Sequence, residues 1–310
     1  MLSHHFEETN IIGSPQVYAY YSDPLPLHGM NFPGTSELIQ IHCDTPALRF
    51  VTEDEITIIR DLLQTRLYLW DRESNTFLLF FQNKMEALTD DPVFIIRGLL
   101  TDKLPNGWIK LHAGCLSLNG TGFLLAGQKR KGKTTTVVRL LELDEEIVFI
   151  ADDKIYYNST SQAAFGSPQP IRLRKEALYE STLFNSEQLK GTWISDKHDT
   201  KFHVTMAELS GTLGREIKPY SNLKFGILVD LNNDGQEEQI TLFEEHEKFD
   251  SASILNEFPD AIHPHWCTTR RNGSVYFLND MPWYRFSGNY RRLEHFKSLL
   301  EFIRKQTKHD

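Results

Sequence analysis

The apolar positions in the first hundred residues come in short runs that favour β-strands. QVYAYY at 16–21 and LIQIH at 38–42 are separated by segments rich in Pro, Gly and Ser, which are typical of turns between short strands. Thr52 lies three residues before Glu55, as in a capping box, and predicts the start of a helix. NTFLLFF at 75–81 predicts another strand. This region is therefore expected to be rich in β-structure.

A change of pattern follows near residue 105. An acidic start at Asp90 followed by VFIIRGLLTDKL predicts a helix that ends at Leu104, before Pro105. The elements expected after it are a strand, a turn, a strand, a loop, a helix and a strand, at 108–118, 119–122, 122–127, 127–134, 134–143 and 146–153. The last strand, helix and strand form a βαβ unit, which requires a parallel sheet covered on its faces.

Two further elements are predicted in the C-terminal half. KFGILVDL at 224–231 and EEQITLF at 237–243 flank Asn232, Asn233, Asp234 and Gly235, which predicts a β-hairpin. Leu293, Phe296, Leu300 and Ile303 are spaced by three, four and three residues. That spacing predicts an amphipathic helix that closes the domain.

The composition indicates an ordinary globular protein of one large domain or two modest ones. The 310 residues (35.9 kDa) are 40% hydrophobic and 24% charged. The net charge of −9 repels polyanions, so no nucleic-acid partner is expected. The longest apolar runs are too short to cross a membrane, so no interaction with a membrane is expected. Cys43, Cys115 and Cys267 lie far apart, which argues against disulfides and for a cytoplasmic protein.

The strongest chemical signal is GQKRKGKT, which matches the G-x-x-x-x-G-K-T phosphate loop between a predicted strand and a predicted helix. Its glycines allow backbone N–H groups to turn toward phosphates, and the helix N-terminus adds partial positive charge. Lys133 would contact the β- and γ-phosphates of ATP, and Thr134 would bind Mg²⁺. The predicted nucleotide-binding residues are Gly127, Gln128, Lys129, Arg130, Lys131, Gly132, Lys133, Thr134 and Thr135.

A second signal is Asp152-Asp153 at the end of the strand that follows the loop and the helix. A strand parallel to the one entering the loop would bring these carboxylates beside the bound phosphates. One of them can hold Mg²⁺ and the other can take a proton from an attacking hydroxyl. Because adjacent strand residues point to opposite faces, only one can face the metal unless the strand ends between them. The alternative, without a functional role, is that the two residues form a solvated turn.

These residues resemble a known family. LHAGCLSLNGTGFLLAGQKRKGKTT followed by IADD is similar to the kinase domain of HPr kinase/phosphorylase and its relatives, over about residues 108–155. A weaker similarity continues through FGSPQPIRLRKEAL at 165–178, which resembles HPr-kinase-like proteins associated with lasso-peptide biosynthesis. The loop interior departs from the family, because Gln128, Lys129, Arg130 and Lys131 stand where the relatives carry small residues.

The resemblance implies a phosphoenolpyruvate-carboxykinase-like nucleotide-binding fold that transfers the γ-phosphate of ATP to a hydroxyl, often that of a serine. It implies phosphate and metal roles for Lys133 and Thr134, a base at Asp152, a metal partner at Asp153 and a position near the reacting phosphate for His112. For His112, a hydrogen-bonded core position is the alternative.

Three weaker clusters remain. Arg172 and Arg174 alternate along a predicted strand, where they could share one face and hold a phosphate or simply form a solvated edge. Residues 230–235 copy the first half of a calcium loop, but Thr241 stands where the loop needs a glutamate. Metal-capable side chains at 263–267 have no evident fourth ligand.

The sequence therefore predicts an α/β protein with a β-rich N-terminal region at 1–104 and an ATP-binding kinase domain at 105–310. The expected cofactors are ATP and Mg²⁺, and the expected acceptor is a serine of a peptide or protein. A small-molecule kinase and a nucleotide-binding module without catalysis remain the alternatives. The sequence leaves open whether copies of the chain form a homo-oligomer.

Overall fold

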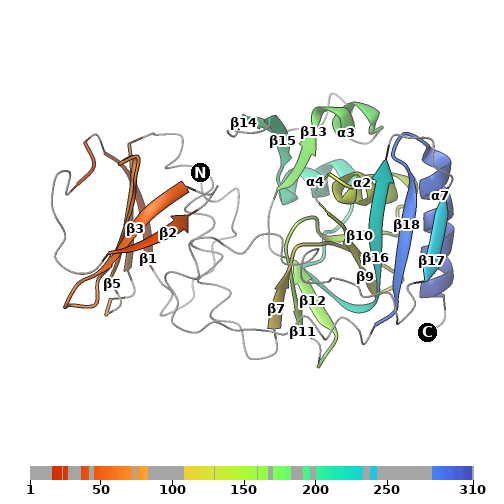
Figure 1. Cartoon of the computed structure of the whole chain (residues 1–310). Helices are drawn as coiled ribbons and strands as arrows, with labels where there is room; N and C mark the ends of the chain where they lie inside the picture. The colour runs from red at the N-terminus through yellow and green to blue at the C-terminus, as the bar shows by residue number, and fades with distance from the viewer. Residues whose placement is uncertain are drawn as a thin grey trace. The chain divides into compact units, whose positions relative to one another are not determined.

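The computed structural model is a mixed α/β structure, rich in strands and with few helices, which confirms the predicted class. It describes residues 16–22, 24–26, 36–41, 45–71, 73–74, 76–82, 108–128, 130–158, 160–166, 170–182, 191–195, 200–232, 238–242 and 281–308. The chain divides into two compact units, one that contains β1 to β6 and one that begins with β7 (Figure 1). The predicted helix over 90–104 lies outside the described residues. No helix among the described residues is long and apolar enough to span a membrane.

The first unit contains a six-stranded sheet in the order β1-β6-β5-β4-β3-β2. Its strands are β1 (Gln16–Tyr21), β2 (Glu37–Ile41), β3 (Thr45–Val51), β4 (Thr57–Asp61), β5 (Arg66–Asp71) and β6 (Thr76–Phe81). β1 runs parallel to β6, and all other neighbours are antiparallel. One face of the sheet buries Tyr68, Phe77, Leu79 and Phe81 completely. The β-rich character predicted for this region is confirmed.

The predicted helix start at Thr52 is wrong. The Thr52 hydroxyl does accept a backbone hydrogen bond, from Ile56, but this bond closes a turn rather than capping a helix. The chain then continues as β4, whose β-branched residues favour an extended backbone. The Asp61 carboxylate accepts hydrogen bonds from the N–H groups of Thr65 and Arg66, which fixes the turn into β5.

The second unit contains a nine-stranded sheet in the order β10-β8-β9-β16-β12-β11-β7, with β18 on β16 and β17 on β18. Its strands are β7 (Trp108–Leu111), β8 (Gly114–Leu118), β9 (Thr121–Ala126), β10 (Val148–Ala151), β11 (Ile155–Asn158), β12 (Ala163–Gly166), β16 (Tyr220–Asn232), β17 (Gln239–Leu242) and β18 (Trp283–Asn289). The β8–β9 turn has positive φ at Asn119 and Gly120, as a tight hairpin requires.

The predicted parallel sheet is wrong in one respect, because the sheet is mixed. β9 and β10 run in the same direction, as a βαβ unit requires, but β8 lies between them and is antiparallel to both. The carboxyl ends of β9, β10 and β16 nevertheless share one edge of the sheet. The loop that follows β9 and the carboxylates that follow β10 are therefore separated by one strand.

The predicted hairpin between 224–231 and 237–243 is also wrong. β17 pairs with β18, and β18 pairs in parallel with β16, so β18 lies where the hairpin partner was expected. Gly226 permits this arrangement, because a Cβ atom there would lie 2.5 Å from the Trp283 ring of β18.

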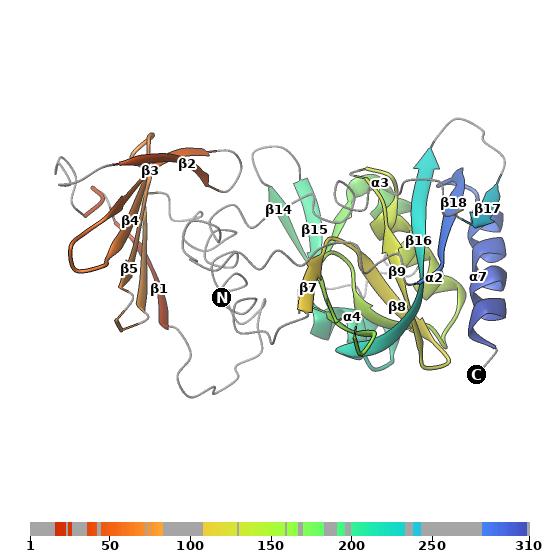
Figure 2. The same ribbon diagram turned by 60° about the horizontal axis from the view of Figure 1, so that its bottom comes forward.

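Helices and a small sheet complete the second unit. The helices are α2 (Lys133–Leu143), α3 (Lys175–Glu180), α4 (Met206–Leu213) and α7 (Leu293–Thr307). The small sheet has the order β13-β15-β14, with β13 (Ile171–Arg174), β14 (Thr192–Ser195) and β15 (Thr200–Val204). The predicted helices at 134–143 and from Leu293 on are confirmed. α7 lies beside β18 in both views and buries Phe296, Leu300 and Ile303 (Figures 1 and 2).

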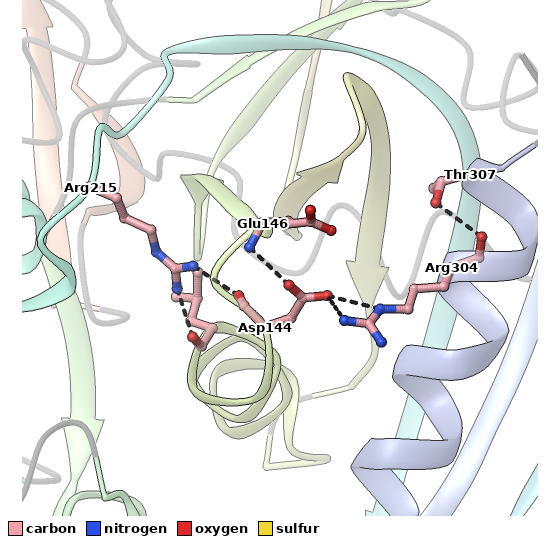
Figure 3. A network of polar contacts seen from close by, with 6 residues as sticks. Asp144, Glu146, Arg215, Arg304 and Thr307 are labelled. Atoms are coloured by element: carbon pink, nitrogen blue, oxygen red, sulfur yellow. Dashed lines mark hydrogen bonds and ion pairs between the residues drawn. The ribbon is translucent and has the colours of Figure 1, made fainter.

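Two arginines hold the C-terminal end of α2 (Figure 3). Arg215 donates from Nη1 to the Asp144 carbonyl at 2.8 Å and from Nη2 to the Leu141 carbonyl at 2.6 Å. Arg304 of α7 donates from Nε and Nη2 to Asp144 Oδ2, at 3.1 and 2.8 Å. The other Asp144 oxygen accepts from the N–H of Glu146 at 2.8 Å. These bonds satisfy carbonyls that a helix end leaves without partners, and they fix α2 against α7.

Arg304→Ala is expected to lower the free energy of unfolding by about 2 kcal/mol, because the buried Asp144 carboxylate loses its charged partner. The matched control is Lys305→Ala in the same exposed turn, which is expected to change it by under about 0.5 kcal/mol. Urea denaturation followed by circular dichroism measures both. Equal losses in the two variants would contradict an anchoring role for Arg304.

Candidate active site

A glycine-rich loop joins β9 to α2, at the position where the sequence predicts a phosphate loop. It leaves β9 at Gly127 and enters α2 after Gly132, whose φ of 92° is left-handed. A Cβ atom at Gly127 would lie 2.5 Å from the Val229 carbonyl oxygen, and one at Gly132 would lie 2.6 Å from Leu231. Both positions therefore need glycine because the loop presses against β16. Lys129 lies outside the described residues.

Two lysines of the loop, Lys131 and Lys133, hold its shape. Lys133 is buried and donates from Nζ to the Gly127 carbonyl at 2.6 Å, so the first and last parts of the loop are joined. Lys131 Nζ lies 2.7 Å from Asp230 Oδ1 at the end of β16, and the Lys131 carbonyl accepts from the N–H of Leu231 at 3.0 Å. Arg130 is exposed and has a φ of 69°. Two of these contacts fix the loop against β16, and the third closes the loop on itself.

Asp152 lies beside the loop and beside the first turn of α2. It follows the last residue of β10, and its Oδ2 accepts a hydrogen bond of 3.0 Å from the Thr134 hydroxyl. Its other oxygen, Oδ1, is buried and has no hydrogen-bond partner among the described residues. The structure therefore brings Asp152, Lys133 and Thr134 into one group at the shared edge of the sheet.

Burial disfavours the ionised form of the Asp152 carboxyl. Loss of solvation, followed in importance by the nearby charge of Asp153, raises the pKa of Asp152 to about 7. The hydrogen bond from Thr134 and the positive charges of Lys133 and Arg172 oppose this rise. A buried carboxyl with an unpartnered oxygen and a pKa near neutrality is typical of a functional group rather than a structural one.

The pKa of Asp152 predicts how stability depends on pH. The folded chain keeps the proton up to about pH 7, whereas the unfolded chain releases it near pH 4. The free energy of unfolding therefore decreases as the pH rises from about 4 to about 7. Asp152→Asn removes this contribution. We expect the wild type to lose about 2 kcal/mol more than the variant between about pH 5 and about pH 7, measured by urea denaturation. Parallel pH profiles would contradict the raised pKa.

His112 and Asp153 form a second pair beside the first. The predicted strand at 108–118 is two strands, since β7 pairs with β11 while β8 pairs with β9 and β10. His112 lies at the break, and its Nδ1 is 3.1 Å from Asp153 Oδ1. The two adjacent carboxyls that follow β10 thus have different partners, Thr134 for Asp152 and His112 for Asp153.

Arg172 and Arg174 lie on β13, where alternate residues are buried. The charge of Arg172 favours ionised Asp152, so this arginine acts on the site electrostatically. Pairing with β15 adds two basic residues that the sequence interpretation missed, since Lys201 lies opposite Arg174 and His203 opposite Arg172. The alternation of polar and apolar residues in the segment 200–204 indicates a strand with Lys201 and His203 on one face. The sequence gives no sign that this strand pairs with β13.

The remaining candidates do not form a metal site in the described part of the chain. Asp230, expected in a half calcium loop, instead pairs with Lys131, and Asp234 and Gly235 lie outside the described residues. The metal-capable group at 263–267 also lies outside them. Within the described residues there is no group of three or more His, Cys, Asp and Glu side chains that could hold a metal ion. A cation here would need a hydroxyl or phosphate ligand as well as the two carboxylates.

Comparison with known proteins finds matches among solved structures. No protein-family model matches the sequence, and no curated protein matches it. Among solved structures, the chain is similar to the Hpr(Ser) kinase/phosphatase from Coxiella burnetii, at 11% sequence identity and a TM-score of 0.31. The similarity covers 64% of this chain and 95% of that chain.

Proposed function

We propose that the second unit, from about residue 105 to the C-terminus, is an ATP- and Mg²⁺-dependent kinase that transfers the γ-phosphate to a hydroxyl of a peptide or protein, most simply a serine. The observation that carries the proposal is the 3.0 Å hydrogen bond between Thr134 and Asp152. It joins the metal-binding hydroxyl of a phosphate-loop motif to a buried carboxyl, the two groups that phosphate transfer requires side by side.

The loop supplies the binding of the phosphates. Gly127 and Gly132 shape a turn whose backbone N–H groups can face an anion, and the N-terminus of α2 adds its partial positive charge. Lys133 would exchange its bond to the Gly127 carbonyl for the β- and γ-phosphate oxygens. The proposed nucleotide site extends from Gly127 to Thr135.

The residues present fit a magnesium ion. Thr134 offers a hydroxyl, Asp153 a carboxylate, and the unpartnered oxygen of Asp152 is the kind of buried group that a nearby cation stabilises. Mg²⁺ usually binds one or two carboxylates together with phosphates and water, so a larger ligand cluster is not needed. Bound there, the ion would offset negative charge on the phosphate oxygens and favour the ionised form of Asp152.

Asp152 is the proposed base. One of its oxygens is engaged by Thr134, which leaves Oδ1 to accept the proton of the acceptor hydroxyl. The hydroxyl oxygen forms a bond to the γ-phosphorus as the bond between that phosphorus and the β–γ bridging oxygen breaks, and ADP leaves. His112, paired with Asp153, is proposed to lie near the transferred phosphoryl group.

Transfer of label from γ-labelled ATP into an extract of the source cells tests the proposal. We expect label in the macromolecular fraction with wild type, and at least a hundred-fold less with Lys133→Ala, because the β- and γ-phosphates lose their cation. Label in the metabolite fraction would indicate a small-molecule kinase instead. ATP binding without transfer to either fraction would indicate a nucleotide-binding module.

A further inference from the structure

The small sheet β13-β15-β14 has an apolar face and a cationic face. The apolar face is part of the core around α2 and includes Ile171, Leu173, Phe202 and Val204. Successive strand residues point to opposite faces, so Arg172, Arg174, Lys201 and His203 share the other one. We name these four residues the basic face. All four are partly buried, so the charges of Arg172, Arg174 and Lys201 are less screened than those of fully exposed side chains.

The spacing on the basic face matches an extended acidic chain. Arg172 and Arg174 are two residues apart, which is about 6.6 Å along a strand, and the neighbouring strand lies about 4.8 Å away. Alternate side chains of a bound extended peptide have the same repeat along the chain. Guanidinium groups bind carboxylates through two parallel hydrogen bonds, which makes this pairing specific as well as strong.

The basic face belongs next to the candidate active site. β13, the strand that contains Arg172 and Arg174, packs against α2. Ile171 and Leu173, on the same strand, belong to the hydrophobic cluster that includes Val137 and Leu140 of α2, the helix that begins at the loop. In Figure 1 the small sheet and the arrowhead of β16 lie at the same end of this unit.

We infer that the basic face binds an acidic segment of the peptide or protein that receives the phosphate, with carboxylate side chains flanking the acceptor hydroxyl. The role of the bound segment as phosphate acceptor rests on the proposed kinase function. The net charge of the chain, −9, repels an acidic partner in general. A local array of cations beside the site would therefore set both where an acidic chain binds and which chains are accepted.

Peptide binding measured without nucleotide tests the inference. The probes are two fluorescent peptides, one of alternating Asp and Ser and one of alternating Asn and Ser, followed by anisotropy. We expect the wild type to bind the Asp peptide at least about ten-fold more tightly, and Arg174→Glu with Lys201→Glu to abolish the difference. Lys297→Glu with Lys305→Glu makes the same change in net charge on exposed positions of α7 and should keep it.

A single, milder substitution separates a loss of binding from a loss of folding. Lys201→Gln should weaken the Asp peptide by about three-fold while the melting temperature stays within about two degrees of wild type. Equal binding of the two peptides by wild type would overturn the inference, as would an equal loss in the α7 control. So would displacement of the Asp peptide by inorganic phosphate at the same concentration, which would indicate a site for small dianions.

The same measurements separate this inference from the proposed function. If wild type prefers the Asp peptide but transfers no label from ATP, the kinase proposal fails and the basic face stands as a binding site. If label is transferred but the two peptides bind alike, the kinase proposal stands and the basic face does not select the acceptor.

Discussion

Asp152→Asn is expected to lower the rate of phosphate transfer by about a thousand-fold. An amide oxygen can still accept the hydrogen bond from Thr134, so the local geometry is kept while the proton acceptor is lost. The variant also removes a negative charge from the proposed metal site. The measurement is the initial rate of label transfer from γ-labelled ATP into the acceptor fraction, with ATP affinity measured separately by calorimetry.

The control for this variant is Glu301→Gln, the same chemical change on the exposed side of α7. It is expected to leave the transfer rate within about two-fold of wild type. A rate near wild type for Asp152→Asn would remove this carboxyl from the mechanism. A slow variant that has also lost ATP affinity would assign Asp152 to nucleotide binding rather than to proton transfer.

Gly127→Ala is expected to lower the free energy of unfolding by about 3 kcal/mol and to abolish ATP binding. The added Cβ atom would lie 2.5 Å from the Val229 carbonyl oxygen, and the φ of 155° is one that side chains rarely adopt. Because the obstacle is the backbone of β16, it cannot move aside as a flexible side chain would. Urea denaturation and calorimetric titration with ATP measure the two effects.

Gly211→Ala provides the matched comparison. Gly211 lies in α4, and a Cβ atom there would have no atom within 4 Å. The substitution is expected to stabilise the chain by about 0.5 kcal/mol, because alanine favours a helix more than glycine does. If both glycine variants bound ATP and unfolded like wild type, the close approach of Gly127 to β16 would be wrong.

The parts that the sequence predicts well are those fixed by neighbouring residues. The turn at Asn119-Gly120 sets the hairpin of β8 and β9. The helical spacing of Phe296, Leu300 and Ile303 sets the buried face of α7, although Leu293, which is part of the same pattern, is exposed. The glycines at 127 and 132 and the carboxyl at Asp152 also carry local signals, because a loop, a helix start and a strand end are each visible in short segments.

The features that the sequence does not predict depend on pairing between strands that are far apart in the sequence, or on two local patterns that favour different backbone conformations. β18 takes the place of β17 beside β16, and nothing in the segment 224–243 shows that a later strand will bind there. The basic face is complete only when Lys201 and His203 are paired with β13. At Thr52, a capping pattern competes with a following run of β-branched residues, and the extended backbone is the outcome.

The position of β8 between β9 and β10 has a consequence for the evolution of this site. The loop and Asp152 are held at a fixed separation by β8, a strand that contributes none of the candidate site residues. A Cβ atom at Gly114, the first residue of β8, would lie 3.0 Å from Val137 of α2 and 3.4 Å from the Asp152 carbonyl oxygen. If the proposed kinase function holds, a larger side chain at Gly114 would displace α2 or Asp152. A mutational library scored for phosphate transfer should then contain few active variants at this position.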